Sequence, residues 1–179
     1  MHLIVGLGNP GKQYDNTRHN VGFLTLDLLA GGLDWENKYD AQFLKSNSVI
    51  LAKPQLFMNL SGQSVAQVLK YYPSAQLVVI HDELDLPVGS MKITKGSGAA
   101  GHNGVQSIID EIGTKDFIRI RVGINNPETK KDLPGEAFVL QKFTAEEDQL
   151  IKEILVKTIE AVEVIQTDGL EAAQSKYNG

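Results

Sequence analysis

Continuous apolar runs and a hairpin pattern predict the inner strands of a β-sheet. Residues 2–5 and 76–81 each contain an unbroken apolar run, which is typical of a strand covered on both faces. Residues 42–46 and 49–53 flank the polar pair Asn47 and Ser48, and this arrangement predicts a β-hairpin.

Alternating patterns predict further strands. Residues 90–95 and 117–124 alternate apolar residues with lysines or arginines, which indicates strands with one face in water. Arg119 and Arg121 are therefore expected on a solvated face. A turn is expected at residues 86–89, where Pro87 is followed by Val88 and Gly89.

Segments in which apolar residues recur at helical spacing lie between these strands. Residues 144–147 (Thr-Ala-Glu-Glu) have the sequence of a capping box and predict the start of a long amphipathic helix that ends at Asp168 and Gly169. Ser61 is expected to cap its own helix. Strands and helices alternate without a repeat or a linker, so residues 1–179 are expected to form one α/β domain. The other helices are expected at residues 19–30, 61–72, 103–112 and 170–177.

Composition is that of an ordinary globular protein. The chain has 179 residues, of which 42% are hydrophobic, enough for a core that folds unaided. No apolar stretch is long enough to span a membrane, and the first residues lack the pattern of a signal peptide. The absence of cysteine excludes disulfides and thiolate metal sites and agrees with a cytoplasmic location.

The net charge of −5 argues at first against a nucleic-acid partner. Its position along the chain weakens that argument. Residues 144–179 hold eight acidic and three basic residues, so acids and bases are equal in number in the rest of the chain. Residues 1–143 can therefore carry a local basic patch.

Residues 6–11 (Gly-Leu-Gly-Asn-Pro-Gly) match the spacing of the dinucleotide-binding fingerprint after a strand. That motif requires its last glycine inside a helix whose N-terminus holds the pyrophosphate. Here Pro10 and residues 12–16 delay the helix by about two turns. The match is weak, and the alternative is a tight turn that displays Asn9.

A histidine and two carboxylates are the candidates for acid–base chemistry. His19 lies where a strand-end loop enters a helix; a single histidine there is more often structural than catalytic, and the carboxylates of residues 82–85 favour the catalytic role. Asp82 and Asp85 follow the buried run that ends at His81, and a buried charge must be paired. A carboxylate that accepts a hydrogen bond from a histidine fixes its tautomer and makes the other ring nitrogen a better base. Asp82 is expected near the core, whereas Asp85 is expected to cap a turn.

Three asparagines are predicted in loops beside the sheet, namely Asn9, Asn59 and Asn103. Asn59 and Asn103 each precede a helix and can serve as its cap, but amides also suit a site that orients a carbonyl group and sugar hydroxyls. Phe57 and Met58, if exposed, offer apolar surface for a base or a side chain. The chain has no Gly-x-Ser-x-Gly elbow, no cysteine and no histidine pair at metal-ligand spacing, so the candidates favour a histidine that activates water.

Six blocks of sequence, taken together and in this order, carry a resemblance to a known family. They are residues 5–14 (Val-Gly-Leu-Gly-Asn-Pro-Gly-Lys-Gln-Tyr), 17–22 (Thr-Arg-His-Asn-Val-Gly), 53–62 (with Phe-Met-Asn-Leu-Ser-Gly at its end), 81–87 (His-Asp-Glu-Leu-Asp-Leu-Pro), 101–104 (Gly-His-Asn-Gly) and 119–124 (Arg-Ile-Arg-Val-Gly-Ile). The chain resembles the bacterial-type peptidyl-tRNA hydrolase family from end to end.

The resemblance implies a three-layer α/β domain with a mixed, twisted central sheet, and an enzyme that hydrolyses the ester between a peptide and the 3′ ribose of tRNA. It implies that His19 activates water, that Asp82 holds and polarises His19, and that Asn9 helps to distinguish blocked from free aminoacyl groups. It implies no metal, no cofactor and no obligate protein partner, as expected of a cytoplasmic monomer. The implied substrate contacts are Tyr14, Phe57, Asn59 and Asn103, with Met58 lining the cleft.

Binding of tRNA is expected to depend on phosphate contacts and therefore on salt. The expected patch consists of Lys92 and Lys95 on one strand and of Arg119 and Arg121 on another, with Lys12 and Arg18 near the cleft; ordinary solvated strand faces are the alternative. The chain departs from the family at Thr94, where relatives often carry a second basic residue, and at residues 97–100, where they often carry a Gly/His-rich run.

Two other functions compete with hydrolysis. The first is a non-catalytic RNA-binding protein on the same fold, which the retention of His19, Asp82 and the three asparagines disfavours. The second is a nucleotide-dependent α/β enzyme based on the glycine motif, and stabilisation of the protein by a nucleotide would favour it.

Overall fold

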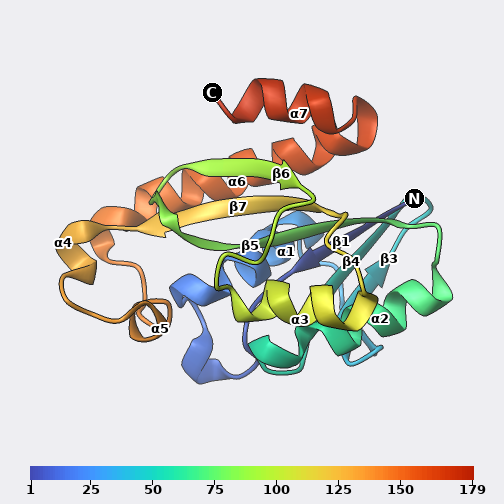
Figure 1. Cartoon of the computed structure of the whole chain (residues 1–179), viewed down its shortest axis with the longest axis horizontal. Coiled ribbons are helices and arrows are strands. Elements are labelled where there is room, and N and C mark those ends of the chain that lie inside the picture. The colour runs from blue at the N-terminus through green and yellow to red at the C-terminus, as the bar shows by residue number, and fades with distance from the viewer.

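The computed structural model describes residues 1–179 and places all strands in one sheet (Figure 1). The seven strands follow the order β2-β3-β4-β1-β5-β7-β6. The four central strands run parallel and are β1 (His2–Gly6), β4 (Val49–Pro54), β5 (Gln76–Pro87) and β7 (Ile118–Asn125). The strands that pair in the antiparallel sense are β2 (Glu36–Lys38), β3 (Ala41–Lys45) and β6 (Met91–Lys95).

Helices cover both faces of the sheet. A core of 18 buried residues joins one face to α1 (Val21–Ala30), α6 (Ala145–Thr167) and α7 (Leu170–Tyr177). A second core of 16 residues joins the other face to α2 (Ser61–Tyr71) and α3 (Asn103–Ile112). Two short helices, α4 (Pro127–Lys130) and α5 (Gly135–Phe138), lie between β7 and α6. The expected three-layer α/β fold with a mixed sheet is thus confirmed, and none of its helices is both long and apolar enough to cross a bilayer.

The strongest sequence patterns gave the right elements. The hairpin forms from β3 and β4, in which Lys45 pairs with Ile50 and Ala41 pairs with Pro54. The capping box at the start of α6 is present, because the Glu147 carboxylate accepts a hydrogen bond of 2.8 Å from the Thr144 N–H.

Other expectations were wrong in detail. The strand that was expected to end at His81 continues as β5 to Pro87, because its second half pairs with β7 around a bulge between Glu83 and Pro87. The sequence patterns gave no sign of β2, whose three residues are all exposed. Ser61 does not cap α2: a 3₁₀ turn, Met58–Leu60, leads directly into the helix, and the buried Ser61 hydroxyl has no partner.

The expectation of a solvated face for Arg119 and Arg121 was also wrong. β7 lies between β5 and β6, so it is an inner strand. Arg119 is 2% exposed and donates a hydrogen bond to the Ser97 hydroxyl in the loop after β6. Arg121 is mostly covered and pairs with Glu83. Apolar and basic residues do alternate along β7, but the loop that carries Ser97 covers Arg119, and Glu83 pairs with Arg121.

The strand order of the sheet reverses at β1, which makes this position a topological switch point. The chain leaves β1 for β4 on one side and then returns to form β5 on the other, so β1 and β5 border the switch point. β1 ends at Gly6, opposite Ile80, while β5 continues past it. An open α/β sheet binds its ligands in the crevice outside the carboxyl ends of strands at such a point.

Close packing of α1 fixes the residues that precede it. A Cβ on Gly22 would lie 2.3 Å from the Leu7 nitrogen and 2.6 Å from the Ile80 oxygen. Only glycine therefore lets the first turn of α1 rest on the ends of β1 and β5. The 3₁₀ turn Arg18–Asn20 directly precedes α1 and contacts β5.

Candidate active site

A cavity of about 700 Å³ opens at the carboxyl ends of β1 and β5. Its wall combines residues from loops that are far apart in the sequence and contains most of the residues that the sequence singled out. These are Asn9, His19, Phe57, Met58, Asn59, Asp82 and Asn103. The rest of the wall is formed by Glu83, Leu84, residues 100–102, Gly135, Glu136, Val139 and Leu140.

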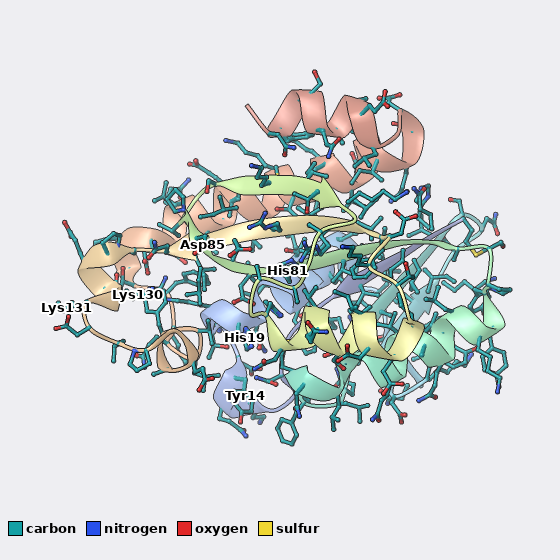
Figure 2. All side chains as sticks on the ribbon, viewed as in Figure 1. Tyr14, His19, His81, Asp85, Lys130 and Lys131 are labelled. Carbon is teal, nitrogen blue, oxygen red and sulfur yellow. The ribbon has the colours of Figure 1, made fainter.

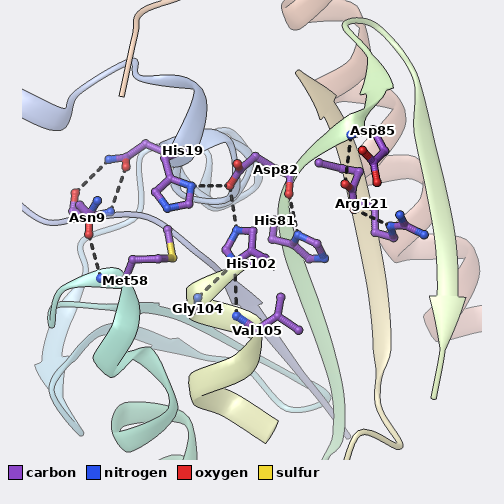
Figure 3. Close-up of polar contacts among 12 residues, drawn as sticks. Asn9, His19, Met58, His81, Asp82, Asp85, His102, Gly104, Val105 and Arg121 are labelled. Carbon is purple, nitrogen blue, oxygen red and sulfur yellow. Dashed lines mark hydrogen bonds and ion pairs between the residues drawn. The ribbon is translucent and has the colours of Figure 1, made fainter. Parts of the chain in front are cut away.

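His19 and Asp82 form a direct pair in this cavity (Figure 3). His19 Nδ1 lies 2.8 Å from Asp82 Oδ1, and the two side chains are 12% and 2% exposed. An ionised Asp82 accepts the Nδ1–H, so the lone pair of His19 lies on Nε2. Nε2 has no hydrogen-bond partner in the protein, which leaves it available to take a proton from a water molecule.

A second histidine, His102, donates to the same oxygen. Its Nδ1 accepts hydrogen bonds from the Gly104 and Val105 N–H groups at 3.1 and 3.3 Å, so this nitrogen carries no proton. The proton is on Nε2, which lies 2.9 Å from Asp82 Oδ1. The contacts of His102 thus fix its tautomer. His102, and not Asn103, is the N-cap residue of α3.

The electrostatics keep Asp82 ionised. Burial by itself raises the pKa of a carboxyl group, but the charge interactions with His19 and His102 and the hydrogen bonds from both histidines outweigh burial and hold the pKa of Asp82 well below its usual range. A permanently charged carboxylate stabilises the imidazolium that forms when His19 takes a proton.

A third histidine, His81, has no access to the cavity. It is fully buried in β5 behind Asp82, and its Nδ1 donates to the Asp82 carbonyl oxygen at 2.7 Å. Burial lowers the pKa of His81 well below its ordinary value, and its Nε2 has no partner. Figure 2 shows His81 within β5 and Asp85 further along the same strand, so Asp85 is a strand residue and not the expected turn cap.

Asn9 is held by two neighbouring segments. Its backbone N–H donates to Asn20 Oδ1 at 2.9 Å, and Asn20 Nδ2 donates to the Asn9 carbonyl at 2.9 Å. The side-chain Oδ1 of Asn9 accepts the Met58 N–H at 2.8 Å. This last contact fixes the amide so that Nδ2 is the free donor at the cavity.

The aromatic and amide residues at one rim differ in exposure. Phe57 is 56% exposed and contacts Tyr14 edge to face, with ring centroids 6.5 Å apart. Tyr14 ends the 3₁₀ turn Lys12–Tyr14, near His19 in the same part of the chain (Figure 2), and is not among the residues that line the cavity. Asn59 is exposed, whereas Met58 is 5% exposed, so only Phe57 offers apolar surface freely.

The basic residues are not one continuous patch. Lys92 and Arg121 are cross-strand partners, but Arg121 Nε lies 2.8 Å from Glu83 Oε2. Lys95 lies three positions from Lys92, hence on the other side of the strand, and its Nζ is 3.3 Å from Asp116. Lys92 is exposed and has no ion-pair partner. Arg18, which was expected near the cleft as a free cation, is fully buried.

His19, Asp82 and His102 are the only three residues whose ligand atoms could surround a metal ion, since these atoms lie within 4.8 Å of one another. A metal needs an unprotonated nitrogen from each histidine. The cap of α3 requires the proton of His102 on Nε2, which is the nitrogen that faces Asp82. The arrangement therefore fits a hydrogen-bonded relay better than a metal site.

Sequence reasoning did not single out His102. Histidine is not among the usual N-cap residues, so its position before α3 did not predict a cap. The available signal was that His102 stands beside Asn103 between two glycines, where a loop enters a helix.

Comparisons with known proteins agree with this geometry. The family model described as Peptidyl-tRNA hydrolase matches residues 3–179. Proteins named peptidyl-tRNA hydrolase from Bdellovibrio bacteriovorus and Chloroflexus aggregans are 44% and 42% identical, each over 99% of this chain and over 100% and 99% of their own lengths. The crystal structure of peptidyl-tRNA hydrolase from Acinetobacter baumannii is similar with a TM-score of 0.87 and 34% identity, over 98% of this chain and 93% of that one. The chain belongs to the peptidyl-tRNA hydrolase family.

Proposed function

We propose that this protein hydrolyses the ester bond between a peptide, or an N-blocked aminoacyl group, and the 3′ ribose of tRNA. The observation that carries the proposal is the His19–Asp82 pair, with His19 Nε2 unpaired at a cavity built at the switch point of the sheet. The family relationship supports the same reaction.

In the proposed mechanism His19 Nε2 removes a proton from a water molecule as the water attacks the ester carbonyl carbon. The charge that develops on the imidazole is balanced by Asp82, which stays ionised. The proton then passes from His19 to the leaving 3′ oxygen of the ribose. General base help of this kind is typically worth about 10²–10⁴-fold in rate.

Hydrogen-bond donors for the ester oxygen come from the asparagines. Asn59 and Asn103 lie in the cavity wall, and Asn103 opens α3, so the N-terminus of that helix favours negative charge on the carbonyl oxygen. The step requires neither a covalent nucleophile nor a metal or cofactor.

Asn9 is the residue proposed to recognise the peptide. Its Nδ2 is a neutral donor whose direction is fixed by the Met58 N–H. A peptide bond next to the ester offers this donor a carbonyl oxygen, whereas a free α-ammonium group offers only further donors. Free aminoacyl-tRNA is therefore rejected.

The 3′ end of the tRNA is proposed to lie along Phe57 and Tyr14, which offer an exposed aromatic surface for a base. Phosphate contacts are proposed for Lys92 and Arg121, which are cross-strand partners, and for Lys95 on the other side of β6. We further propose that the protein works as a monomer in the cytoplasm.

The test compares N-acetylated aminoacyl-tRNA with the same tRNA bearing a free α-amino group. The proposal expects wild-type protein to hydrolyse the first and spare the second, and Asn9→Ala to lose this preference. Wild-type protein that binds both tRNAs and cleaves neither would instead be a non-catalytic RNA-binding protein.

A further inference from the structure

A buried ion pair lies directly behind the candidate base. Arg18, the residue before His19, is fully buried and makes a two-point contact with Glu147, at 3.0 Å from Nη1 to Oε1 and 2.6 Å from Nη2 to Oε2. The guanidinium group also lies 4.4 Å and 4.8 Å from the ring centroids of Phe138 and Phe143. Arg18 is therefore fixed by charge, by hydrogen-bond direction and by flanking rings.

The Glu147 carboxylate accepts hydrogen bonds from separate segments of the chain. Glu147 belongs to the first turn of α6 and accepts hydrogen bonds from Asn126 Nδ2 at 2.9 Å and from the Thr144 N–H at 2.8 Å. Arg18 Nη1 in turn donates to the Ile124 carbonyl at the end of β7. One pair thus joins the end of β7, the segment after it and the start of α6 to the chain that carries His19.

The backbone on either side of this pair forms a short ladder. The Arg18 N–H donates to the Gln141 carbonyl at 2.9 Å, and the His19 N–H donates to the Val139 carbonyl at 2.8 Å. A bridge between Thr17 and Lys142 extends the ladder. Val139 lies in the cavity wall, so these hydrogen bonds fix the position of the His19 backbone relative to that part of the wall.

Burial of two charges is not explained by stability alone. The desolvation of a buried ion pair often cancels its attraction, and apolar residues of similar size frequently stabilise a protein more. Nor does the pair take part in the reaction, because Arg18 has no exposed surface. What the pair supplies is direction, since a planar guanidinium and a carboxylate fit in only a few orientations.

We propose that the Arg18–Glu147 pair is a positioning device for His19, which holds the backbone of the base in the orientation that its contact with Asp82 requires. This inference rests on the proposed function. A displacement of about 1 Å at a catalytic group can cost on the order of 10²-fold in rate. Loss of the pair should therefore lower turnover without weakening tRNA binding.

The decisive variant is Arg18→Met/Glu147→Gln, which removes both charges while glutamine keeps the capping box of α6. Arg18→Met alone leaves the Glu147 carboxylate buried without its cationic partner, so it should lower the melting temperature strongly. The double variant should recover most of this loss. Its kcat should nevertheless stay at least about 10-fold below wild type, with KM unchanged within about 2-fold.

A matched control distinguishes the loss of His19 positioning from a general loss of stability. Ile165→Ala removes a buried side chain near the far end of α6 and should lower the melting temperature while kcat stays at the wild-type value. An NMR readout that needs no turnover completes the design. The Nδ1–H resonance of His19, hydrogen-bonded to Asp82, should be present in wild type and in Ile165→Ala and be lost or shifted in the double variant.

The outcomes are distinct. A folded double variant with wild-type kcat and an unchanged Nδ1–H resonance would overturn the positioning role and leave a structural one. If wild-type protein itself failed to hydrolyse the ester, the proposed function would fail, and the NMR comparison would still decide whether the pair orients His19.

Discussion

His102 offers a prediction in which two roles of one side chain can be separated. Its Nδ1 caps α3 by accepting the Gly104 and Val105 N–H groups, and its Nε2–H donates to Asp82. His102→Ala removes both contacts. His102→Asn keeps a short acceptor at the cap, where asparagine is a preferred residue, but its side chain is too short to reach Asp82.

The magnitudes follow from these contacts. Loss of a helix N-cap typically costs about 1 kcal/mol, and loss of a hydrogen bond to a charged group costs about 1.5–3 kcal/mol. We expect His102→Ala to lose about 3 kcal/mol of unfolding free energy and His102→Asn about 2 kcal/mol. The difference of about 1 kcal/mol corresponds to roughly 2–4 °C in melting temperature for a chain of this size.

Urea unfolding followed by circular dichroism measures these differences, and the hydrolysis of N-acetylated aminoacyl-tRNA measures the effect on turnover. Both variants free Asp82 from one of its two donors, so both should lower kcat by a similar factor, on the order of 10-fold. The variants should therefore differ in stability and agree in activity.

Equal stability of the two variants would show that His102 does not cap α3 in solution. Wild-type turnover in both would show that Asp82 needs only His19 to stay in place. Either result would refute the assignment of His102 as the residue that links α3 to the candidate active site.

Further predictions concern pH, RNA binding and packing. Burial depresses the pKa of His81, so below its ordinary value of 6.5 the unfolded chain binds a proton that the folded protein does not. The free energy of unfolding should then fall by up to about 1.4 kcal/mol per pH unit on acidification below about pH 6.5. Urea unfolding between pH 7.5 and 5 should show that this dependence on pH is smaller in His81→Gln than in wild type by that amount, and an equal dependence in both proteins would contradict it. Lys92→Ala should weaken tRNA binding and reduce its salt slope by about 1, while Lys152→Ala, on the acidic helix α6, should change neither; equal slopes for all three proteins would remove Lys92 from the interface. Gly22→Ala should cost about 1–3 kcal/mol and lower kcat, because the added methyl group pushes the start of α1 off β1 and β5, and wild-type values in a melting and a turnover assay would contradict this.

Periodic apolar patterns made most of the fold predictable. β1 and the first half of β5 are continuous apolar runs, and α6 starts with a capping box, so local sequence and tertiary packing agree there. β2 could not be predicted, because its exposed residues (Glu-Asn-Lys) form a strand only by pairing with β3. The extension of β5 to Pro87 likewise depends on its partner β7 and not on its own residues.

The candidate site was predictable where a residue follows a buried strand. Asn9 follows the end of β1 and Asp82 follows the apolar run of the neighbouring strand β5, so both reach the crevice beside the end of β1. The environment of the arginines was not predictable, because a strand pattern does not reveal what covers its polar face. Arg18 and Arg119 looked like free cations in the sequence and are buried by Glu147 and its neighbours and by the Ser97 loop.

His19 is the proposed base that activates water. Its role is tested by comparing wild type with His19→Ala on N-acetylated aminoacyl-tRNA, with tRNA affinity and melting temperature measured on the same samples. We expect the variant to fold, to bind tRNA as wild type does and to lose turnover by at least about 10²-fold. A folded His19→Ala protein with near-normal turnover would contradict this proposal and transfer the role of base to another group.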